Sequence, residues 1–418
     1  MFRRRRRSLA HLLFATVGRF LLAMLAAQLS IAATLVGWDA IVRRRRAKRE
    51  SVRTTDPVEL SVADSTTTTY TFGEDLYAAM LEAIEGAQKQ ILLETYIWKA
   101  DSYGERFKQA LIDASNRGVE VFVIYDGFAN LVVRRSFFDL PTPIHVMRYP
   151  AVRAGLVALN IRKSGRDHRK ILVVDDHIGF VGGYNIGDVY ATEWRDTHLR
   201  IVGPSAWELR NAFVDFWNTQ RGTEHPALLD HGSDFWEPRI RAAVNAPAHM
   251  VFPIRGLYLA AIDRARHHIY ITQGYFIPDR EILEALLGAA GRGVDVRVLM
   301  PEVSNHVVAD WLSRGLYTTL LRGGVSIWLY QGAMVHAKTA TIDGAWTTIG
   351  TANIDRLSLT GNYEINVEIY DDGLAAEMER IFARDLANCR QLTLDEWKRR
   401  HVVARFSEAV LRPMRPLL

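Results

Sequence analysis

Two segments of this 418-residue chain carry histidine, lysine and aspartate at one spacing, which is His-x-Lys-x4-Asp. The residues are His168, Lys170 and Asp175 in the first segment and His336, Lys338 and Asp343 in the second. A single match to so short a pattern arises by chance now and then, but two matches in one chain are harder to dismiss. If both segments contribute to one site, the pattern supplies two imidazoles and two ammonium groups for a single reaction.

The agreement between the two segments continues beyond the motif itself. A glycine follows each histidine by 14 residues, an asparagine by 17 and a carboxylate by 28. These residues are Gly182, Asn185 and Asp196 after the first histidine, and Gly350, Asn353 and Glu364 after the second. Agreement at three further positions indicates a duplicated unit with one shared site.

These side chains suit the transfer of a phosphodiester group. One imidazole can attack phosphorus covalently, and a second, protonated imidazole can donate to the leaving alcohol and later deprotonate the incoming one. The two lysines, with the amides of Asn185 and Asn353, can hold the phosphate oxygens. Asp196 and Glu364 can each orient an imidazole through its other ring nitrogen. This scheme needs no metal or cofactor, and no compact ligand cluster in the sequence argues for one.

The spacing also predicts the elements that position these groups. Residues i and i+2 lie on one face of a strand, so a strand starting near each lysine presents that lysine beside its histidine. Asp175 and Asp343 complete the catalytic motif, but they would lie near the far strand ends, where we expect a structural or supporting role. Each motif belongs to a repeat of helix, apolar strand, helix, Arg-Gly turn and apolar strand, which indicates an α/β sheet covered by helices.

We therefore predict an α/β fold in which two repeated α/β/α sandwich halves form one pseudo-twofold catalytic unit behind an N-terminal membrane helix. The predicted boundaries, in chain order, are a basic-flanked anchor at 1–50, a linker at 51–66, a first repeat at 67–222, a connection at 223–250, a second repeat at 251–393 and a C-terminal tail at 394–418. For the tail, a helix along a membrane surface and a solvated helix are both open.

The positive charge of the chain is concentrated ahead of the repeats. Residues 1–50 carry a net charge of +10 and the remainder carries −5, so the acidic body does not suggest a nucleic-acid partner. Residues 20–38 are free of charge, span roughly 28 Å as a helix, and lie between arginine clusters. A retained anchor in the cell membrane is favoured over a cleaved secretory signal or a buried helix. The single cysteine, Cys389, excludes an intrachain disulfide.

The motifs resemble those of the phospholipase D superfamily, and within it the bacterial cardiolipin synthases. The resemblance covers roughly residues 70–390 and is carried, besides the two motifs, by segments 93–97, 117–119, 182–185, 194–198, 330–331, 350–353 and 362–364. It implies that the two repeats face each other around one pocket, with His168 as the nucleophile and His336 as acid and base. It further implies phospholipid substrates, with phosphatidylglycerol giving cardiolipin and glycerol, and a catalytic body on the cytoplasmic side of the membrane.

The chain departs from the superfamily where a serine often follows the glycine after the motif. Gly183 and Thr351 stand at this position, so no serine hydroxyl is available in either half. The departure leaves the subgroup and the substrates open. Three other functions also remain open: a hydrolytic phospholipase D, a nuclease of the superfamily, and an inactive lipid-binding scaffold. The anchor and the acidic body oppose the nuclease, the two complete motifs oppose the scaffold, and the sequence does not give the oligomeric state.

Overall fold

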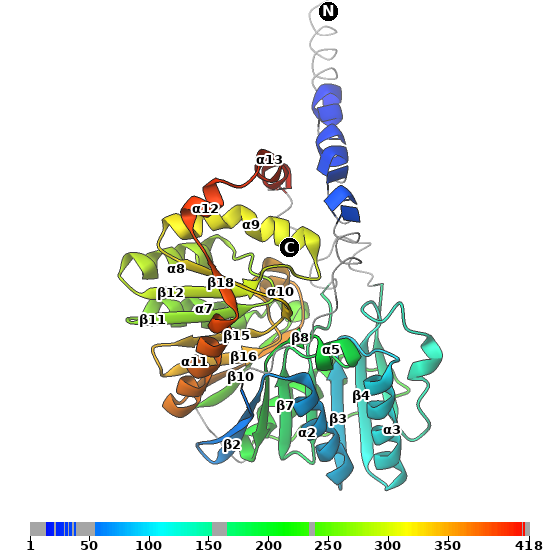
Figure 1. Ribbon diagram of the computed structural model, residues 1–418. Coiled ribbons are helices and arrows are strands. Elements are labelled where there is room, and N and C mark those ends of the chain that lie inside the picture. The colour runs from blue at the N-terminus through cyan, green and yellow to red at the C-terminus, as the bar shows by residue number, and fades with distance from the viewer. Residues whose placement is uncertain are drawn as a thin grey trace, which may run out of the picture.

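Two eight-stranded sheets form the two halves of the protein, which stand side by side in Figure 1. The computed structural model describes residues 14–20, 22–28, 30–31, 33–35, 37–38, 55–152, 165–233, 239–411 and 413. Helices pack on the sheets in both halves. The predicted α/β class with two repeated halves is confirmed.

In the residues that the structure describes, the first half contains one sheet and four α-helices. Its strands are β1 (Val58–Val62), β2 (Ser65–Tyr70), β3 (Gln90–Thr95), β4 (Glu120–Asp126), β5 (His145–Tyr149), β6 (Ile171–Val174), β7 (Ile178–Gly182) and β9 (His198–Val202). Their order in the sheet is β1-β2-β9-β7-β6-β3-β4-β5. The helices are α2 (Gly73–Gly86), α3 (Ser102–Asn116), α5 (Asp188–Thr192) and α6 (Trp207–Gln220).

The second half repeats this plan and adds helices at its C-terminal end. Its strands are β10 (Ile240–Asn245), β11 (His268–Gln273), β12 (Asp295–Pro301), β13 (Ser326–Tyr330), β15 (Lys338–Ile342), β16 (Trp346–Gly350), β17 (Glu364–Tyr370) and β18 (Cys389–Leu392), in the order β10-β17-β16-β15-β11-β12-β13-β18. The helices are α7 (Pro253–Arg264), α8 (Arg280–Gly291), α9 (Val307–Arg322), α10 (Arg356–Thr360), α11 (Asp372–Ala387), α12 (Leu394–Lys398) and α13 (Val402–Leu411).

The same local signals build the helix–turn–strand unit in each half. Asp101 caps α3 and Asp279 caps α8, each by accepting a hydrogen bond from the backbone amide three residues later. Both helices end at an Arg-Gly pair, in which Gly118 has φ 93° and Gly293 has φ 91°. Residues with a side chain disfavour these left-handed values, so the glycines allow the chain to turn directly into β4 and β12.

An apolar core joins the two halves. It includes Val181 and Leu199 of the first sheet and Ile349, Ile365 and Val367 of the second, all of which are fully buried. A short parallel pair between β8 (Trp194–Arg195) and β14 (Met334–Val335) adds a backbone connection. Because burial of apolar surface is the main force that drives association, the halves are held in a fixed relation.

Two segments predicted as connections contain strands. The predicted linker at 51–66 includes β1, which pairs with β2, so the first sheet begins by Val58. The predicted connection at 223–250 includes β10, which pairs with β17 and belongs to the second sheet. The polar residues of segment 51–66 suggested a linker, but β1 reads Val-Glu-Leu-Ser-Val, and this alternation of apolar and polar side chains suits a strand.

Within the described part of the chain, one helix is long and apolar enough to cross a membrane. It is Phe14–Leu35, with 22 residues and a mean hydropathy of 1.6. It begins before the predicted span at residues 20–38 and includes Arg19, and in Figure 1 it projects away from both halves. The arginine clusters predicted to flank it lie outside the described residues.

Candidate active site

The backbone of each motif histidine is bonded to the opposite half. The amide of His168 donates to the carbonyl oxygen of Tyr363 at 3.0 Å, and the amide of His336 donates to that of Arg195 at 2.7 Å. Tyr363 and Arg195 directly precede the two carboxylates found in register. These backbone hydrogen bonds therefore place each carboxylate next to the histidine of the other half.

Each imidazole is paired with a carboxylate across the junction. Nδ1 of His168 lies 2.9 Å from Oε2 of Glu364, and Nδ1 of His336 lies 2.7 Å from Oδ2 of Asp196. Both carboxylates are buried, as is His336. Because Nδ1 is occupied in each ring, Nε2 is the nitrogen left for a substrate. The structure thus brings the four groups together in crossed pairs, which the register of the repeats did not predict.

The two motif lysines are buried beside the histidines. Nζ of Lys170 donates to the carbonyl oxygen of His168 at 2.7 Å, and Nζ of Lys338 makes the same contact with His336. Burial lowers the pKa of Lys170 to about 8 and that of Lys338 to about 7, although Glu364 and Asp196 oppose the shift. Ammonium groups held in a buried site attract a phosphate anion strongly, because little water screens them.

The two imidazole–carboxylate pairs differ in their electrostatics. Burial raises the pKa of Glu364 to about 8. Burial also acts to raise the pKa of Asp196, but His336 and Lys338 hold it below its ordinary value. Burial and then a neighbouring lysine lower the pKa of His336 to about 3 and that of His168 well below its usual range. An anionic phosphodiester bound between the rings would favour their protonated forms.

The residue that follows the glycine in register, Gly182 or Gly350, differs between the halves: it is Gly183 in the first and Thr351 in the second. Each lies beside the carboxylate of its own half. A Cβ atom at Gly183 would lie 2.1 Å from Oδ1 of Asp196, so only glycine leaves space for this carboxylate. In the second half, Oγ1 of Thr351 donates to Oε2 of Glu364 at 2.6 Å. The prediction that no serine hydroxyl is available holds, yet a threonine hydroxyl occupies the place. The register with Gly183 was the signal that could have identified Thr351.

The two predicted asparagines are buried near the strand ends that carry the site. Oδ1 of Asn185 accepts from the amide of Ile97 at 3.2 Å. Oδ1 of Asn353 is buried and has no hydrogen-bond partner among the residues described. Contact of these amides with phosphate oxygens stays a prediction.

Asp175 and Asp343 do not join the site, which corrects their grouping with the catalytic residues. Strands β6 and β15 separate them from the lysines, and both residues have φ 53° in the turns that follow. Their carboxylates accept from three successive backbone amides at 2.7–2.9 Å: Gln88, Lys89 and Gln90 for Asp175, and Arg266, His267 and His268 for Asp343. The expected structural role therefore agrees with these contacts, which fix the start of β3 and β11.

Aromatic rings and a buried ion pair complete the surroundings. The ring centroid of Tyr96 lies 4.6 Å from that of His168, and the ring of Trp194 lies 4.9 Å from that of His336. The guanidinium of Arg195 pairs with Asp385 at 2.6 Å, both side chains being 1% exposed. Since Arg195 adjoins Asp196 and Asp385 lies on α11, this pair ties one carboxylate to the other half. Tyr96, Trp194 and Arg195 lie in segments that carry the family resemblance, but sequence reasoning gave them no role. Asp385 was missed because it belongs neither to those segments nor to the repeated motif.

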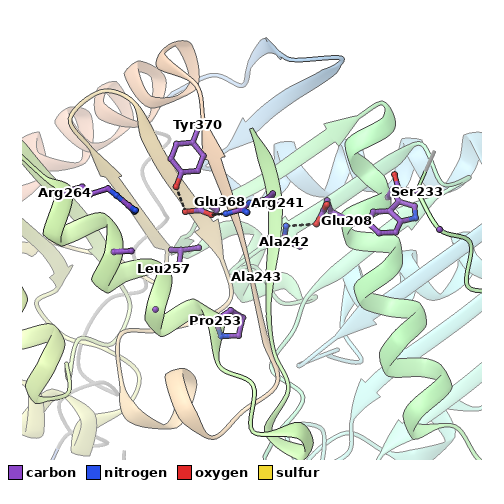
Figure 2. A pocket seen from close by; sticks show the side chains of 14 residues that line it. Glu208, Ser233, Arg241, Ala242, Ala243, Pro253, Leu257, Arg264, Glu368 and Tyr370 are labelled. Carbon is purple, nitrogen blue, oxygen red and sulfur yellow. Dashed lines mark hydrogen bonds and ion pairs between the residues drawn. The ribbon is translucent and has the colours of Figure 1, made fainter. Parts of the chain in front are cut away.

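A cavity of about 860 Å³ lies away from these residues, between α6, β10 and α7 (Figure 2). Arg241 pairs with Glu368 there at 2.9 Å, and Glu208 accepts from the amide of Ala242 at 2.8 Å. No motif residue lines this cavity. Among the described residues, no three His, Cys, Asp or Glu side chains are grouped as a metal site requires.

Comparison with known proteins agrees with this geometry. Residues 80–217 and 258–386 match the family model described as "Cardiolipin synthase, PLD-like domain". The chain is 32% identical over 365 residues to a cardiolipin synthase of Clostridium perfringens, which covers 84% of this chain and 76% of that one. It is 31% identical over 371 residues to the major cardiolipin synthase of Bacillus subtilis, at 85% and 76% coverage. A phosphatidylserine synthase structure from Haemophilus influenzae shares the fold, with a TM-score of 0.66, 15% identity and coverage of 87% and 94%.

Proposed function

This chain belongs to the PLD-like cardiolipin synthase family, and we propose that it joins two phosphatidylglycerol molecules into cardiolipin and releases glycerol. The observation that carries the proposal is the pair of imidazoles, His336 buried and His168 partly exposed, each held through Nδ1 by a carboxylate of the other half. Two such rings, with two buried lysines, supply the nucleophile, the acid and the cations that phosphatidyl transfer needs.

The first half of the reaction forms a covalent intermediate. Nε2 of His168 attacks the phosphorus of the donor lipid, and the bond from phosphorus to the glycerol oxygen breaks. His336 donates a proton to that oxygen, so glycerol leaves as a neutral alcohol. Lys170 and Lys338 balance the negative charge on the phosphoryl oxygens. Asp196 is suited to hold His336 as an imidazolium, because its own pKa is kept low.

The second half of the reaction transfers the phosphatidyl group. His336, now neutral, takes a proton from a hydroxyl of the second lipid, whose oxygen attacks phosphorus. The bond from phosphorus to Nε2 of His168 breaks, and both histidines return to their starting state. Water in place of the lipid hydroxyl would give phosphatidic acid, so the acceptor decides between transfer and hydrolysis.

The N-terminal helix accounts for access to lipid. We propose that Phe14–Leu35 anchors the enzyme in the cell membrane. By analogy with the family, the catalytic body then lies on the cytoplasmic side. A cysteine at the exposed His267 in intact cells, probed with a membrane-impermeant thiol reagent, tests this orientation; labelling without lysis would place the body outside.

The purified full-length enzyme with labelled phosphatidylglycerol in detergent tests the chemistry. We expect cardiolipin and glycerol in equal amounts, and loss of both products in His168→Ala and His336→Ala. His267→Ala is the matched control, because His267 is exposed and lies outside the site. Phosphatidic acid as the sole lipid product would identify a hydrolase. Turnover of bis(p-nitrophenyl) phosphate without lipid turnover would favour a nuclease.

A further inference from the structure

Three apolar side chains of the C-terminal helix α13 point outward, whereas Leu411 at its end is buried. Val402 is 72% exposed and Phe406 is 63% exposed, and Ala409 continues the same exposed face. The opposite face, which packs on the protein, contains the polar residues Ser407 and Glu408, exposed by only 6% and 7%. A surface helix of a soluble protein normally shows the reverse arrangement, with its apolar stripe inward.

Specific contacts hold α13 in this orientation. Glu408 pairs with Arg400 at 2.8 Å, and the guanidinium of Arg400 lies 4.2 Å from the ring centre of Trp397. Nε1 of Trp397 donates to Oγ1 of Thr318 on α9, and Leu411 is fully buried in the core of the second half. The inward carboxylate is thus satisfied, and the outward apolar face follows from a defined packing arrangement.

The helix also contacts the candidate membrane span. Nε2 of Gln28 donates to the carbonyl oxygen of Val410 at 3.1 Å, and Ile31 and Leu35 pack against the same apolar core as Leu411. Figure 1 shows α13 beside the N-terminal helix, near the end where that helix meets the body. A bilayer crossed by the N-terminal helix would therefore have its surface close to α13.

We infer that α13 lies in the surface of that bilayer, with Val402, Phe406 and Ala409 among the acyl chains. This inference rests on the membrane placement proposed above. Arg399 precedes this helix and Arg405 lies on it, and both side chains are exposed. Their positive charges favour binding to anionic lipid headgroups. An apolar helix face at the interface between acyl chains and headgroups is the arrangement that amphipathic membrane-surface helices adopt.

The position of α13 bears on the reaction through α9, on which it packs. The residue before α9 is His306, whose ring centroid lies 5.4 Å from that of Tyr275, and Tyr275 lies 5.9 Å from His336. A docked α13 would therefore set the distance between the catalytic histidines and the lipid headgroups.

Fluorescence from one labelled position tests the placement without any need for turnover. The full-length chain carries a single cysteine, Cys389, so Cys389→Ser with Phe406→Cys allows an environment-sensitive label on α13 alone. The matched control is Leu229→Cys, because Leu229 is 71% exposed but lies away from the site. Its carbonyl oxygen accepts a hydrogen bond from Arg210, and Arg210 pairs with Asp176 at the end of β6 opposite the site. Both proteins are reconstituted in phosphatidylglycerol–phosphatidylcholine vesicles.

We expect a blue-shifted emission at position 406 that lipid-borne nitroxides quench, and water-like, unquenched emission at position 229. Water-like emission at both positions would overturn the inference. A blue shift at position 406 that persists in detergent and resists lipid quenchers would also overturn it, because it would show contact with a second copy of the chain. Failure of the proposed lipid chemistry would leave the label readout unchanged, so the two hypotheses are separable.

Discussion

Nδ1 of His336 and Oδ2 of Asp196 lie 2.7 Å apart, although 140 residues separate them in the chain and they belong to different halves. The second pair, His168 and Glu364, is separated by 196 residues and crosses in the opposite direction. Neither half alone therefore contains a motif histidine together with its carboxylate partner. The duplicated sequence produces one site, because each half completes the other.

Asp196→Asn tests the carboxylate that crosses to His336. An amide cannot stabilise an imidazolium as a carboxylate does, and it can hold the ring in the wrong tautomer. We expect kcat for cardiolipin formation to fall by about 10²–10⁴-fold with thermal unfolding little changed. Asp176→Asn is the control, since this half-exposed carboxylate lies at the far end of β6. Near-normal kcat in Asp196→Asn would remove the carboxylate from the mechanism.

Gly183→Ala tests the space left for the same carboxylate. The added Cβ would meet both oxygens of Asp196 at 2.1 and 2.5 Å, so the carboxylate must move away from His336. We expect a loss of kcat of about tenfold or more, since a misplacement of about 1 Å can cost 10²-fold. Gly256→Ala is the control, because a Cβ at that helical position meets nothing within 4 Å. Equal activity of the two variants would contradict the packing argument.

Asp175→Ala tests the structural role of the motif aspartates. The change leaves three backbone amides without their charged acceptor and places alanine at φ 53°. We expect the free energy of unfolding to fall by about 3 kcal/mol while kcat per folded molecule stays near normal. Asp175→Asn should lose less, because its Oδ1 still accepts and asparagine tolerates this backbone region. A stable but inactive Asp175→Ala enzyme would return Asp175 to the catalytic set.

The sequence predicted the fold, and the grouping of the motif histidines and lysines with Asp196 and Glu364, for reasons that are local or repeated. Helices, Arg-Gly turns and apolar strands recur in the same order in both halves, so a duplicated α/β plan was visible without coordinates. The strand spacing likewise placed Lys170 beside His168. Asp175 fell outside the site because a strand of fixed length separates it from Lys170.

The pairing between the halves was not visible in the sequence. Asp196 and Glu364 occupy the same register in both repeats, so a pairing within each half and a pairing across the junction fit the repeats equally well. Only the backbone bonds at Arg195 and Tyr363 select the crossed arrangement. The site also depends on Asp385, which has no counterpart in the motif and is brought to Arg195 by the packing of α11.

The pH dependence of kcat/KM tests the buried lysines. This parameter reports ionisations of the free enzyme. Lys338, with a pKa of about 7, and Lys170, with a pKa of about 8, lose their positive charge as the pH rises through these values. His336 acts in its protonated form and has a pKa of about 3 in the free enzyme, so kcat/KM already declines with pH. We expect this decline to steepen from about pH 7 upward as the lysines lose their charge, whereas kcat should hold to higher pH because bound phosphate favours the ammonium forms. A kcat/KM whose decline does not steepen up to about pH 9.5 would contradict this role.

A lipid with a good leaving group separates the roles of the two histidines. Phosphatidyl-p-nitrophenol needs no protonation of the departing oxygen, so His336→Ala should still form the covalent intermediate on His168. We expect this variant to release one equivalent of p-nitrophenolate in a burst and then stall, because no base activates the acceptor. His168→Ala should give no burst, and mass spectrometry should find the phosphatidyl group on His168 alone. A burst in His168→Ala with none in His336→Ala would make His336 the nucleophile and His168 the acid and base. The experiment thus decides between two rings that stand in nearly symmetric positions and differ in their carboxylate partners.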